Sequence, residues 1–302
     1  MRSNHFLKLI SDTTPVWQNS PHGVRSGFVS LVGRPNVGKS TLLNALVGRK
    51  VSIVSNKPQT TRTAVRGVLT IGEAQAVFVD TPGLHKAVSA LGEKINATAL
   101  GSTKDVDVTC LVIDATQPIG KGDEWVASQV DMSRCVVVLN KSDKASREQM
   151  LAQLARASRF NAESYFPVSA AMGDGIDALK AHLLQLMPEG EFLYPSEMVS
   201  ETDDVTWVAE LVREVLLDRT DEELPYSIAT RASVSDDGAV ICEIVVERES
   251  QKGMVIGKGG SMLKAVRQAV KPQLPKGVRL ELTVVVDKNW QQRADRVERL
   301  GY

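Results

Sequence analysis

The chain has 302 residues, 43% of them hydrophobic and 24% charged, with a formal net charge of zero. This length allows two domains with separate cores, and the composition excludes a disordered or uniformly polycationic chain. The three cysteines form no CxxC pair or Cys/His cluster, and the longest apolar runs are strand-sized. These features argue against a structural zinc site, a disulfide framework and a membrane-spanning helix.

Residues 1–26 lack the apolar core of a secretory signal and are predicted to form a disordered extension. Short apolar runs then alternate with helix-length segments as far as residue 188. Most runs are rich in β-branched residues and apolar throughout, which is typical of parallel strands covered by helices on both faces. This pattern predicts a doubly wound α/β domain over residues 27–188. The expected strands are 28–32, 65–71, 76–79, 108–113, 135–139 and 165–168, and the expected helices are 39–47, 88–103, 123–132, 147–160 and 176–187.

The pattern changes after this domain. Prolines, a glycine and acidic residues predict a linker over residues 189–204, which leads into a second domain over residues 205–302. The expected order of elements in that domain is α-β-β-α-α-β, which predicts a small α+β fold. Its expected helices are 205–218, a short one before the glycine-rich turn, 261–270 and 290–300, and its expected strands are 226–234, 239–247 and 278–286.

The stretch Gly33-Arg34-Pro35-Asn36-Val37-Gly38-Lys39-Ser40 fits the pattern GxxxxGK[ST] between an expected strand and an expected helix. Glycines let the backbone wrap around phosphates, and the helix N-terminus presents N–H groups to the anion. Lys39 supplies a positive charge to the β- and γ-phosphates, and Ser40 supplies a hydroxyl ligand to Mg²⁺. The predicted phosphate site consists of Gly33, Asn36, Val37, Gly38, Lys39, Ser40 and Thr41.

Two polar motifs follow later strands. In Asp80-Thr81-Pro82-Gly83, the carboxylate can reach the Mg²⁺ shell and the Gly83 N–H can contact a γ-phosphate. In Asn140-Lys141-Ser142-Asp143, the Asp143 carboxylate can accept the N1–H and the amino group of guanine, two donors that adenine does not offer. Lys141 is expected to lie over the base. The predicted nucleotide site is completed by Asp80, Gly83, Asn140, Lys141, Asp143, Ser169 and Ala170, where the last two offer a backbone N–H to the guanine carbonyl.

The loop Lys57-Pro58-Gln59-Thr60-Thr61-Arg62 lies between these motifs and offers a hydroxyl that joins Mg²⁺ when the γ-phosphate is present. Thr61 is predicted for this role, with Thr60 as the alternative. Hydrolysis is then in-line attack of water on the γ-phosphorus, with charge taken up by Mg²⁺, Lys39 and loop amides. The predicted metal ligands are Ser40, Thr61 and Asp80, and the predicted catalytic residues are Lys39, Thr61 and Gly83.

The general base is not assigned. Leu84 cannot orient water, and a lone histidine such as His85 is more often structural, so slow intrinsic turnover that a partner or ion stimulates is predicted. A further hypothesis concerns a monovalent cation: Asn36 helps to hold potassium near the phosphates, where its charge replaces an arginine finger.

Val255-Ile256-Gly257-Lys258-Gly259-Gly260-Ser261 contains a GxxG turn between two expected helices. Such a turn lets a nucleic-acid backbone approach closely, while apolar neighbours form a groove for bases. Residues 251–302 contain eleven basic and four acidic residues, an excess of seven positive charges in a neutral chain. The predicted RNA-binding residues are Val255, Ile256, Gly257, Lys258, Gly259, Gly260, Ser261 and Lys264.

With these motifs in place, the chain resembles the Era family of bacterial GTPases from residue 27 to residue 302. The segments that carry the resemblance are GRPNVGKSTLLNAL, KPQTTR, DTPGLH, NKSD, ELPYSIA, QKGMVIGKGG and KNW…LGY, of which ELPYSIA and QKGMVIGKGG are the most specific. The resemblance implies a P-loop GTPase domain with a doubly wound mixed sheet, followed by a type II KH domain. Glu281, Asp287, Pro272 and Pro275 depart from the family pattern and lower the RNA affinity that it implies.

The resemblance also implies hydrolysis of GTP to GDP with Mg²⁺, and binding of 16S ribosomal RNA near its 3′ end during assembly of the small ribosomal subunit. It further implies a monomer in the cytoplasm with loose association with the inner face of the cell membrane. One alternative is an RNA chaperone whose nucleotide domain is a sensor with negligible turnover. Another places the partner on a membrane or in a tRNA-modifying complex, and the KH-like segment argues against it.

Overall fold

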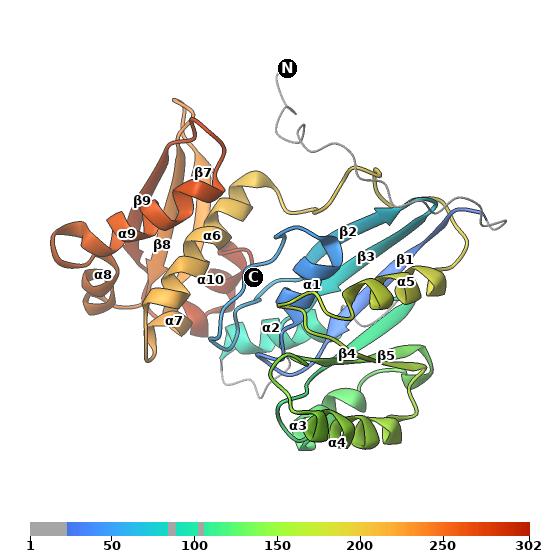
Figure 1. Cartoon of the computed structure of the whole chain (residues 1–302). Helices are drawn as coiled ribbons and strands as arrows, with labels where there is room; N and C mark the ends of the chain where they lie inside the picture. Colours follow the sequence, from blue (N-terminus) through green and yellow to red (C-terminus); the bar gives the residue numbers. More distant parts are fainter. Residues whose placement is uncertain (1–22, 84–88, 102–105) are drawn as a thin grey trace.

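The computed structural model describes residues 23–83, 89–101 and 106–302, which form two domains (Figure 1). The first domain is built on a sheet with the strand order β2-β3-β1-β4-β5-β6. All neighbouring strands are parallel except β2, which runs antiparallel to β3. The prediction of a doubly wound mixed sheet is therefore confirmed. The strands are β1 (Arg25–Val32), β2 (Val65–Ile71), β3 (Ala74–Asp80), β4 (Val108–Asp114), β5 (Cys135–Asn140) and β6 (Ser164–Pro167).

Helices cover both faces of this sheet, and alternate residues of each central strand enter two separate cores. In β4, Cys110 and Val112 face the core under α1 and α5, whereas Leu111 and Ile113 face the core under α3 and α4. All four are at most 1% exposed, which explains why the run is apolar throughout. The helices are α1 (Lys39–Val47), α2 (Ala90–Gly101), α3 (Lys121–Ala127), α4 (Arg147–Ala157) and α5 (Ile176–Leu186).

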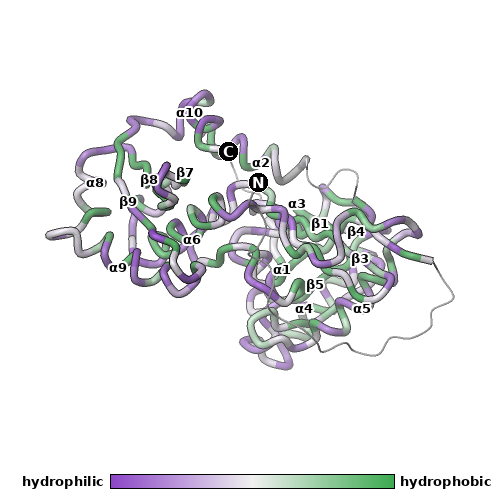
Figure 2. Tube along the Cα trace, turned by 90° about the horizontal axis from the view of Figure 1, so that it is seen from above, coloured by the Kyte–Doolittle hydropathy of each residue, from purple (hydrophilic) through white to green (hydrophobic). Residues whose placement is uncertain are grey.

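The second domain has a three-stranded sheet in the order β7-β8-β9, with β7 antiparallel and β9 parallel to β8. Apolar residues of α6, α8 and α9 pack on one face of it. Hydrophobic and hydrophilic stretches alternate along the chain in both domains (Figure 2). The predicted α+β fold is confirmed. Its elements are α6 (Asp204–Arg219), α7 (Leu224–Ser227), β7 (Ala229–Val234), β8 (Val240–Val246), α8 (Glu249–Ile256), α9 (Ser261–Val270), β9 (Leu280–Val286) and α10 (Ala294–Arg299).

Two predicted boundaries in this domain were wrong. The strand expected from residue 226 begins at Ala229, because Pro225 opens the helical turn α7 and the Ser227 hydroxyl donates back to Glu223 and Leu224. The helix expected over 290–300 is divided into η5 (Trp290–Gln292) and α10, since Arg293 between them is extended. Both differences arise from short turns that hydrophobic periodicity does not report.

The segment between the domains is bound along the edge of the first sheet, and we call residues 189–203 the strap. Gln75, which is fully buried, accepts from the N–H groups of Leu193 and Tyr194 at 2.8 and 3.0 Å. Its amide nitrogen donates to the carbonyl of Tyr194 at 2.8 Å. Further along, Val68 N–H donates to the carbonyl of Val199. The strap is therefore ordered against β2 and β3.

The predicted extension over residues 1–26 lies outside the described residues as far as residue 22, and β1 already begins at Arg25. Within the described parts of the chain, every helix is too short or too polar to cross a bilayer.

Candidate nucleotide and RNA sites

The predicted phosphate loop connects β1 to α1. Gly38 has φ +97°, and a Cβ there would lie 2.3 Å from the side-chain nitrogen of Asn140. Any other residue at this position would therefore meet both backbone strain and a clash. Helix α1 begins directly after it at Lys39, so the free N–H groups of the first turn lie at the end of the loop. This is the arrangement that the motif predicts for binding a phosphate.

The Lys39 side chain is held inside the curve of the loop. Its ammonium donates to the carbonyl oxygens of Gly33 and Arg34 at 3.1 and 3.0 Å. Burial lowers the pKa of Lys39 to about 8, although Asp80 acts in the opposite direction. A charge in such a poorly solvated position interacts more strongly with an anion than a charge in water does.

The three predicted metal ligands converge. The Ser40 hydroxyl lies 2.7 Å from Asp80 Oδ2 and 3.0 Å from the Thr61 hydroxyl, which itself lies 3.3 Å from Asp80 Oδ2. Thr60 donates to the carbonyl of Lys57 at 2.7 Å, within its own loop. The geometry therefore favours Thr61 over Thr60 as the hydroxyl of this cluster.

The residues of this cluster fit Mg²⁺. Asp80 is fully buried, and its Oδ1 has no hydrogen-bond partner among the described residues. Burial raises the pKa of Asp80, whereas Lys39 and the neighbouring hydroxyls lower it. One carboxylate and two hydroxyls are too few to enclose a divalent cation, but Mg²⁺ typically completes such a set with phosphate oxygens and water. Ser52, which sequence analysis missed, also donates to Asp80, at 3.1 Å.

A cleft open to solvent lies over this cluster. It brings together the phosphate loop, the loop with Thr61, and Gly83, as the three motifs predict. Thr41 also lines it. Leu84 and His85 lie outside the described residues, so their predicted lack of a catalytic role stays a prediction.

Asn140 joins the phosphate loop to the predicted guanine loop. It is 2% exposed, its amide nitrogen donates to the Val37 carbonyl at 2.9 Å, and its amide oxygen accepts from Ala170 N–H at 3.0 Å. Asp143 is exposed, and its Oδ1 accepts from the Ser169 hydroxyl at 2.6 Å. The predicted guanine residues are thus brought together, with Asn140 positioning both loops.

Lys141 crosses the space between these loops. Its ammonium donates to the Asn36 carbonyl at 2.8 Å and pairs with Asp114 at 2.7 Å. All three residues line a second cleft, which is also open to solvent. Asp114 was missed by sequence analysis, although it ends β4 at the same sheet edge where Asp80 ends β3, and that shared position was a usable signal.

The GxxG turn lies between α8 and α9. Gly257 has φ +75°, and a Cβ there would lie 2.7 Å from the backbone nitrogen of Met262. Gly259 and Gly260 also have positive φ, but the space beside them is open. The turn therefore exposes bare backbone to a strand that approaches from outside, as RNA binding requires.

The predicted RNA-binding residues divide into two groups. Lys258, Ser261 and Lys264 are exposed beside the turn, and Ile256 is partly buried. Val255 is fully buried in the core with Val266, so its side chain cannot contact RNA and that part of the prediction was wrong. Helix periodicity places Val255 on the inner face of α8.

The structure shows the surroundings of three residues that depart from the family pattern. Asp287 is paired with Arg296 at 3.1 Å, which neutralises both charges at the end of β9. Helix α9 ends at Val270, two residues before Pro272, as predicted. Glu281 is exposed on β9.

A phosphate loop beside the converged Ser40–Thr61–Asp80 cluster on a mixed α/β sheet, joined to a GxxG domain, defines a P-loop GTPase with a KH domain. Residues 28–141 match the family described as 50S ribosome-binding GTPase, and residues 223–291 match the KH domain.

Known proteins match nearly the whole chain. GTPase Era of Heliobacterium modesticaldum is 40% identical over 291 residues, which cover 92% of this chain and 97% of that protein. GTPase Era of Mycobacterium tuberculosis is 42% identical over 295 residues, with coverage of 92% and 98%. The chain belongs to the Era family of GTPases.

Solved structures of Era proteins match the same part of the chain. A variant of Era from Aquifex aeolicus bound to GDP and AlF4⁻ has a TM-score of 0.87 and 36% identity, and the match covers 92% of this chain and 99% of that chain. Era in complex with MgGDPNP and nucleotides 1506–1542 of 16S ribosomal RNA matches with the same TM-score, identity and coverage.

Proposed function

We propose that this GTPase is a switch that binds 16S ribosomal RNA near its 3′ end and acts in assembly of the small ribosomal subunit. The observation that carries the proposal is the presence, in one chain, of a converged Ser40–Thr61–Asp80 cluster beside a phosphate loop and of an open GxxG turn. The related Era complex with MgGDPNP and a 16S segment supports the same pairing of nucleotide and RNA.

In this proposal each site residue has one role. Lys39 and the loop amides bind the phosphates, and Ser40, Thr61 and Asp80 hold Mg²⁺, which neutralises charge on the transferred phosphoryl group. Gly83 N–H contacts the γ-phosphate. Asp143, held by Ser169, selects guanine. No described side chain is assigned as general base, so intrinsic turnover is slow.

We also propose that potassium assists hydrolysis at Asn36. This residue has φ +64° and is exposed at the rim of both clefts, and its amide nitrogen donates to the Asn56 carbonyl at 2.8 Å. That contact places it between the phosphate loop and the loop that leads to Thr61. Single-turnover hydrolysis measured in sodium and in potassium buffers tests this role, and equal rates would remove it.

The proposed working form is a cytoplasmic monomer that associates peripherally with the inner face of the cell membrane. This part is carried by the family resemblance alone. Sedimentation equilibrium tests the monomer, and flotation with anionic lipid vesicles tests the membrane association. A stable dimer, or the absence of flotation at low salt, would contradict these two statements.

The RNA proposal is tested by crosslinking the full chain to small-subunit RNA in the presence of GTP, GDP or no nucleotide. Gly260→Asp places an anion where the RNA backbone passes and is expected to abolish the crosslink at the 3′ end. Gly238→Asp is the matched control, because both glycines have φ near +80° and open surroundings but Gly238 lies in the β7–β8 turn. Equal crosslinking by both variants would contradict the assignment of the groove.

A further inference from the structure

The peptide group before Thr61 is held by the second domain. Arg213 of α6 is 1% exposed, and its guanidinium donates to the Thr60 carbonyl at 2.6 Å. Glu210, one turn earlier, accepts from Nε and from the same terminal nitrogen at 2.9 and 2.5 Å. A bidentate pair of this kind fixes the plane of the guanidinium. Arg213 therefore meets the loop in one orientation.

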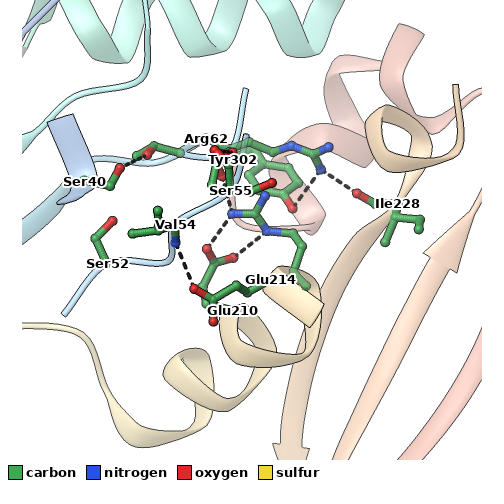
Figure 3. A network of polar contacts seen from close by, with 12 residues as sticks. Ser40, Ser52, Val54, Ser55, Arg62, Glu210, Glu214, Ile228 and Tyr302 are labelled. Carbon is green, nitrogen blue, oxygen red and sulfur yellow. Dashed lines mark hydrogen bonds and ion pairs between the residues drawn. The ribbon is translucent and has the colours of Figure 1, made fainter. Parts of the chain in front are cut away.

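The residue after Thr61 is held by the second domain as well. Arg62 is 3% exposed and donates to the carbonyl of Ile228 at 2.7 Å (Figure 3) and to the carbonyl of Tyr226 at 3.0 Å. Its guanidinium also lies 5.7 and 5.4 Å from the ring centres of Trp290 and Tyr302. We call these four residues the Arg62 receptor. They come from the ELPYSIA and KNW…LGY segments, whose function the nucleotide and RNA sites leave unexplained.

The same receptor touches the helix that follows Gly83. Leu91 and Ile95 of α2 are at most 1% exposed and pack in one cluster with Trp290 and Val297. Figures 1 and 2 both show α2 beside α10. Trp290 is therefore shared by the contact to Arg62 and the contact to α2.

Outer contacts continue along the loop. Glu214 of α6 accepts from Val54 N–H at 2.9 Å (Figure 3). It also pairs with Lys50 at 2.5 Å, and Lys57 pairs with Asp221 at 2.8 Å. Exposed ion pairs contribute little energy. The buried contacts of Arg62 and Arg213 on either side of Thr61 are therefore the ones that fix the loop.

We propose that the KH domain is the positioning element for Thr61: Arg213 and the Arg62 receptor hold its hydroxyl at the Ser40–Asp80 cluster, so Mg²⁺-dependent GTP binding requires the docked second domain. The proposal rests on the proposed function, which makes Thr61 a ligand of Mg²⁺. Docking removes in advance the entropy cost of ordering this loop around the metal. Because linkage is reciprocal, Mg²⁺ and GTP in turn favour the docked arrangement.

The test uses the full chain with Arg213→Met or Arg62→Met. Affinity for a non-hydrolysable GTP analogue is measured by fluorescence over a Mg²⁺ titration and in EDTA. Losing a charged hydrogen bond between the loop and the second domain is expected to weaken Mg²⁺-dependent affinity on the order of tenfold and to leave the EDTA value unchanged. Arg219→Met on the exposed end of α6 and Arg66→Met on β2 are the matched controls. Equal affinity of variants and controls would overturn the proposal.

A double-mutant cycle separates positioning from general destabilisation. Once Thr61→Ala has removed the hydroxyl, Arg213→Met is expected to add less than a twofold further loss, whereas additive losses would overturn the proposal. Tyr302→Phe, which removes one hydroxyl 3.3 Å from Arg62, gives a milder variant if Arg62→Met fails to fold. It is expected to weaken Mg²⁺-dependent affinity measurably with an unchanged melting temperature, and wild-type affinity would count against the receptor.

The Thr61→Ala variant distinguishes failure of the metal assignment from failure of the positioning proposal. If Thr61→Ala keeps wild-type dependence on Mg²⁺, the metal assignment is wrong and the positioning proposal falls with it. If Thr61→Ala loses that dependence while both arginine variants keep it, only the positioning proposal is wrong.

Discussion

Asn140 lies where the phosphate loop meets the guanine loop, and its replacement by alanine is expected to disconnect them. The change removes two buried hydrogen bonds, to the Val37 carbonyl at 2.9 Å and from Ala170 N–H at 3.0 Å. Each backbone group left unpaired in a buried site costs about 1–3 kcal/mol. Asn140→Ala should therefore lower the free energy of unfolding by about 2–6 kcal/mol.

Part of this loss should appear in nucleotide binding, because the loops no longer hold the geometry that both ends of GTP need. We expect GDP and GTP affinity to fall at least about tenfold, which corresponds to about 1.4 kcal/mol. Fluorescent-nucleotide titration measures the affinity, and urea denaturation without nucleotide measures the stability.

Gln153→Ala is the control for this experiment. Gln153 is 4% exposed and accepts from Ile119 N–H at 3.0 Å, and neither residue lines either of the two clefts. Its replacement should destabilise the fold by about 1–3 kcal/mol with nucleotide affinity within about twofold of wild type. Equal losses of affinity in the two variants, or wild-type affinity in Asn140→Ala, would refute the reasoning.

Two further predictions concern the nucleotide site, and a third concerns the turn between β7 and β8. Asp143→Asn replaces an acceptor with a donor facing guanine, so competition binding should show GTP affinity reduced about 100-fold or more with ATP affinity unchanged, and parallel losses would speak against base selection. Ser40→Ala should weaken GTP binding in Mg²⁺ but match wild type after chelation with EDTA, and a defect that persists in EDTA would contradict a metal role. The Ser235 hydroxyl, and then Arg279, lower the pKa of Asp237 from 3.8 to about 2, so its stabilising contribution is complete above pH 4 and is lost as pH falls toward 2. NMR titration should show this pKa rising in Arg279→Met, and an unchanged value would argue against the ion pair.

Much of the nucleotide site could be predicted because its signals are local. An apolar run that ends in a polar residue marks both a buried strand and its carboxyl end, and Asp80 and Asn140 are indeed the last residues of β3 and β5. Parallel strands bring such ends to one edge of a sheet, so the pattern along the chain was sufficient to place both residues at the same sheet edge.

The contacts between the domains could not be predicted in this way. Arg213 and Thr60 are 153 positions apart, and an arginine in an amphipathic helix is ordinarily solvent-exposed. The sequence around Arg62 likewise does not predict that its guanidinium binds backbone carbonyls more than 160 residues later in the chain. Val255 shows the opposite error, because its position next to a glycine-rich turn suggested exposure while its place in the helix period buries it.

The strap along β2 determines how far the second domain can travel. Ser200 pairs with Gly67 at the edge of the sheet, and Asp203 caps the start of α6. The chain between these two points can therefore span at most about 10 Å. With so short a tether the KH domain can rotate but cannot move far from the first domain. The effective concentration of its docking face at the loop that carries Thr61 therefore stays millimolar or higher. Release from the loop that carries Thr61 is then a pivot that reverses within the same molecule, and the strap also shields the outer strand from pairing with another chain.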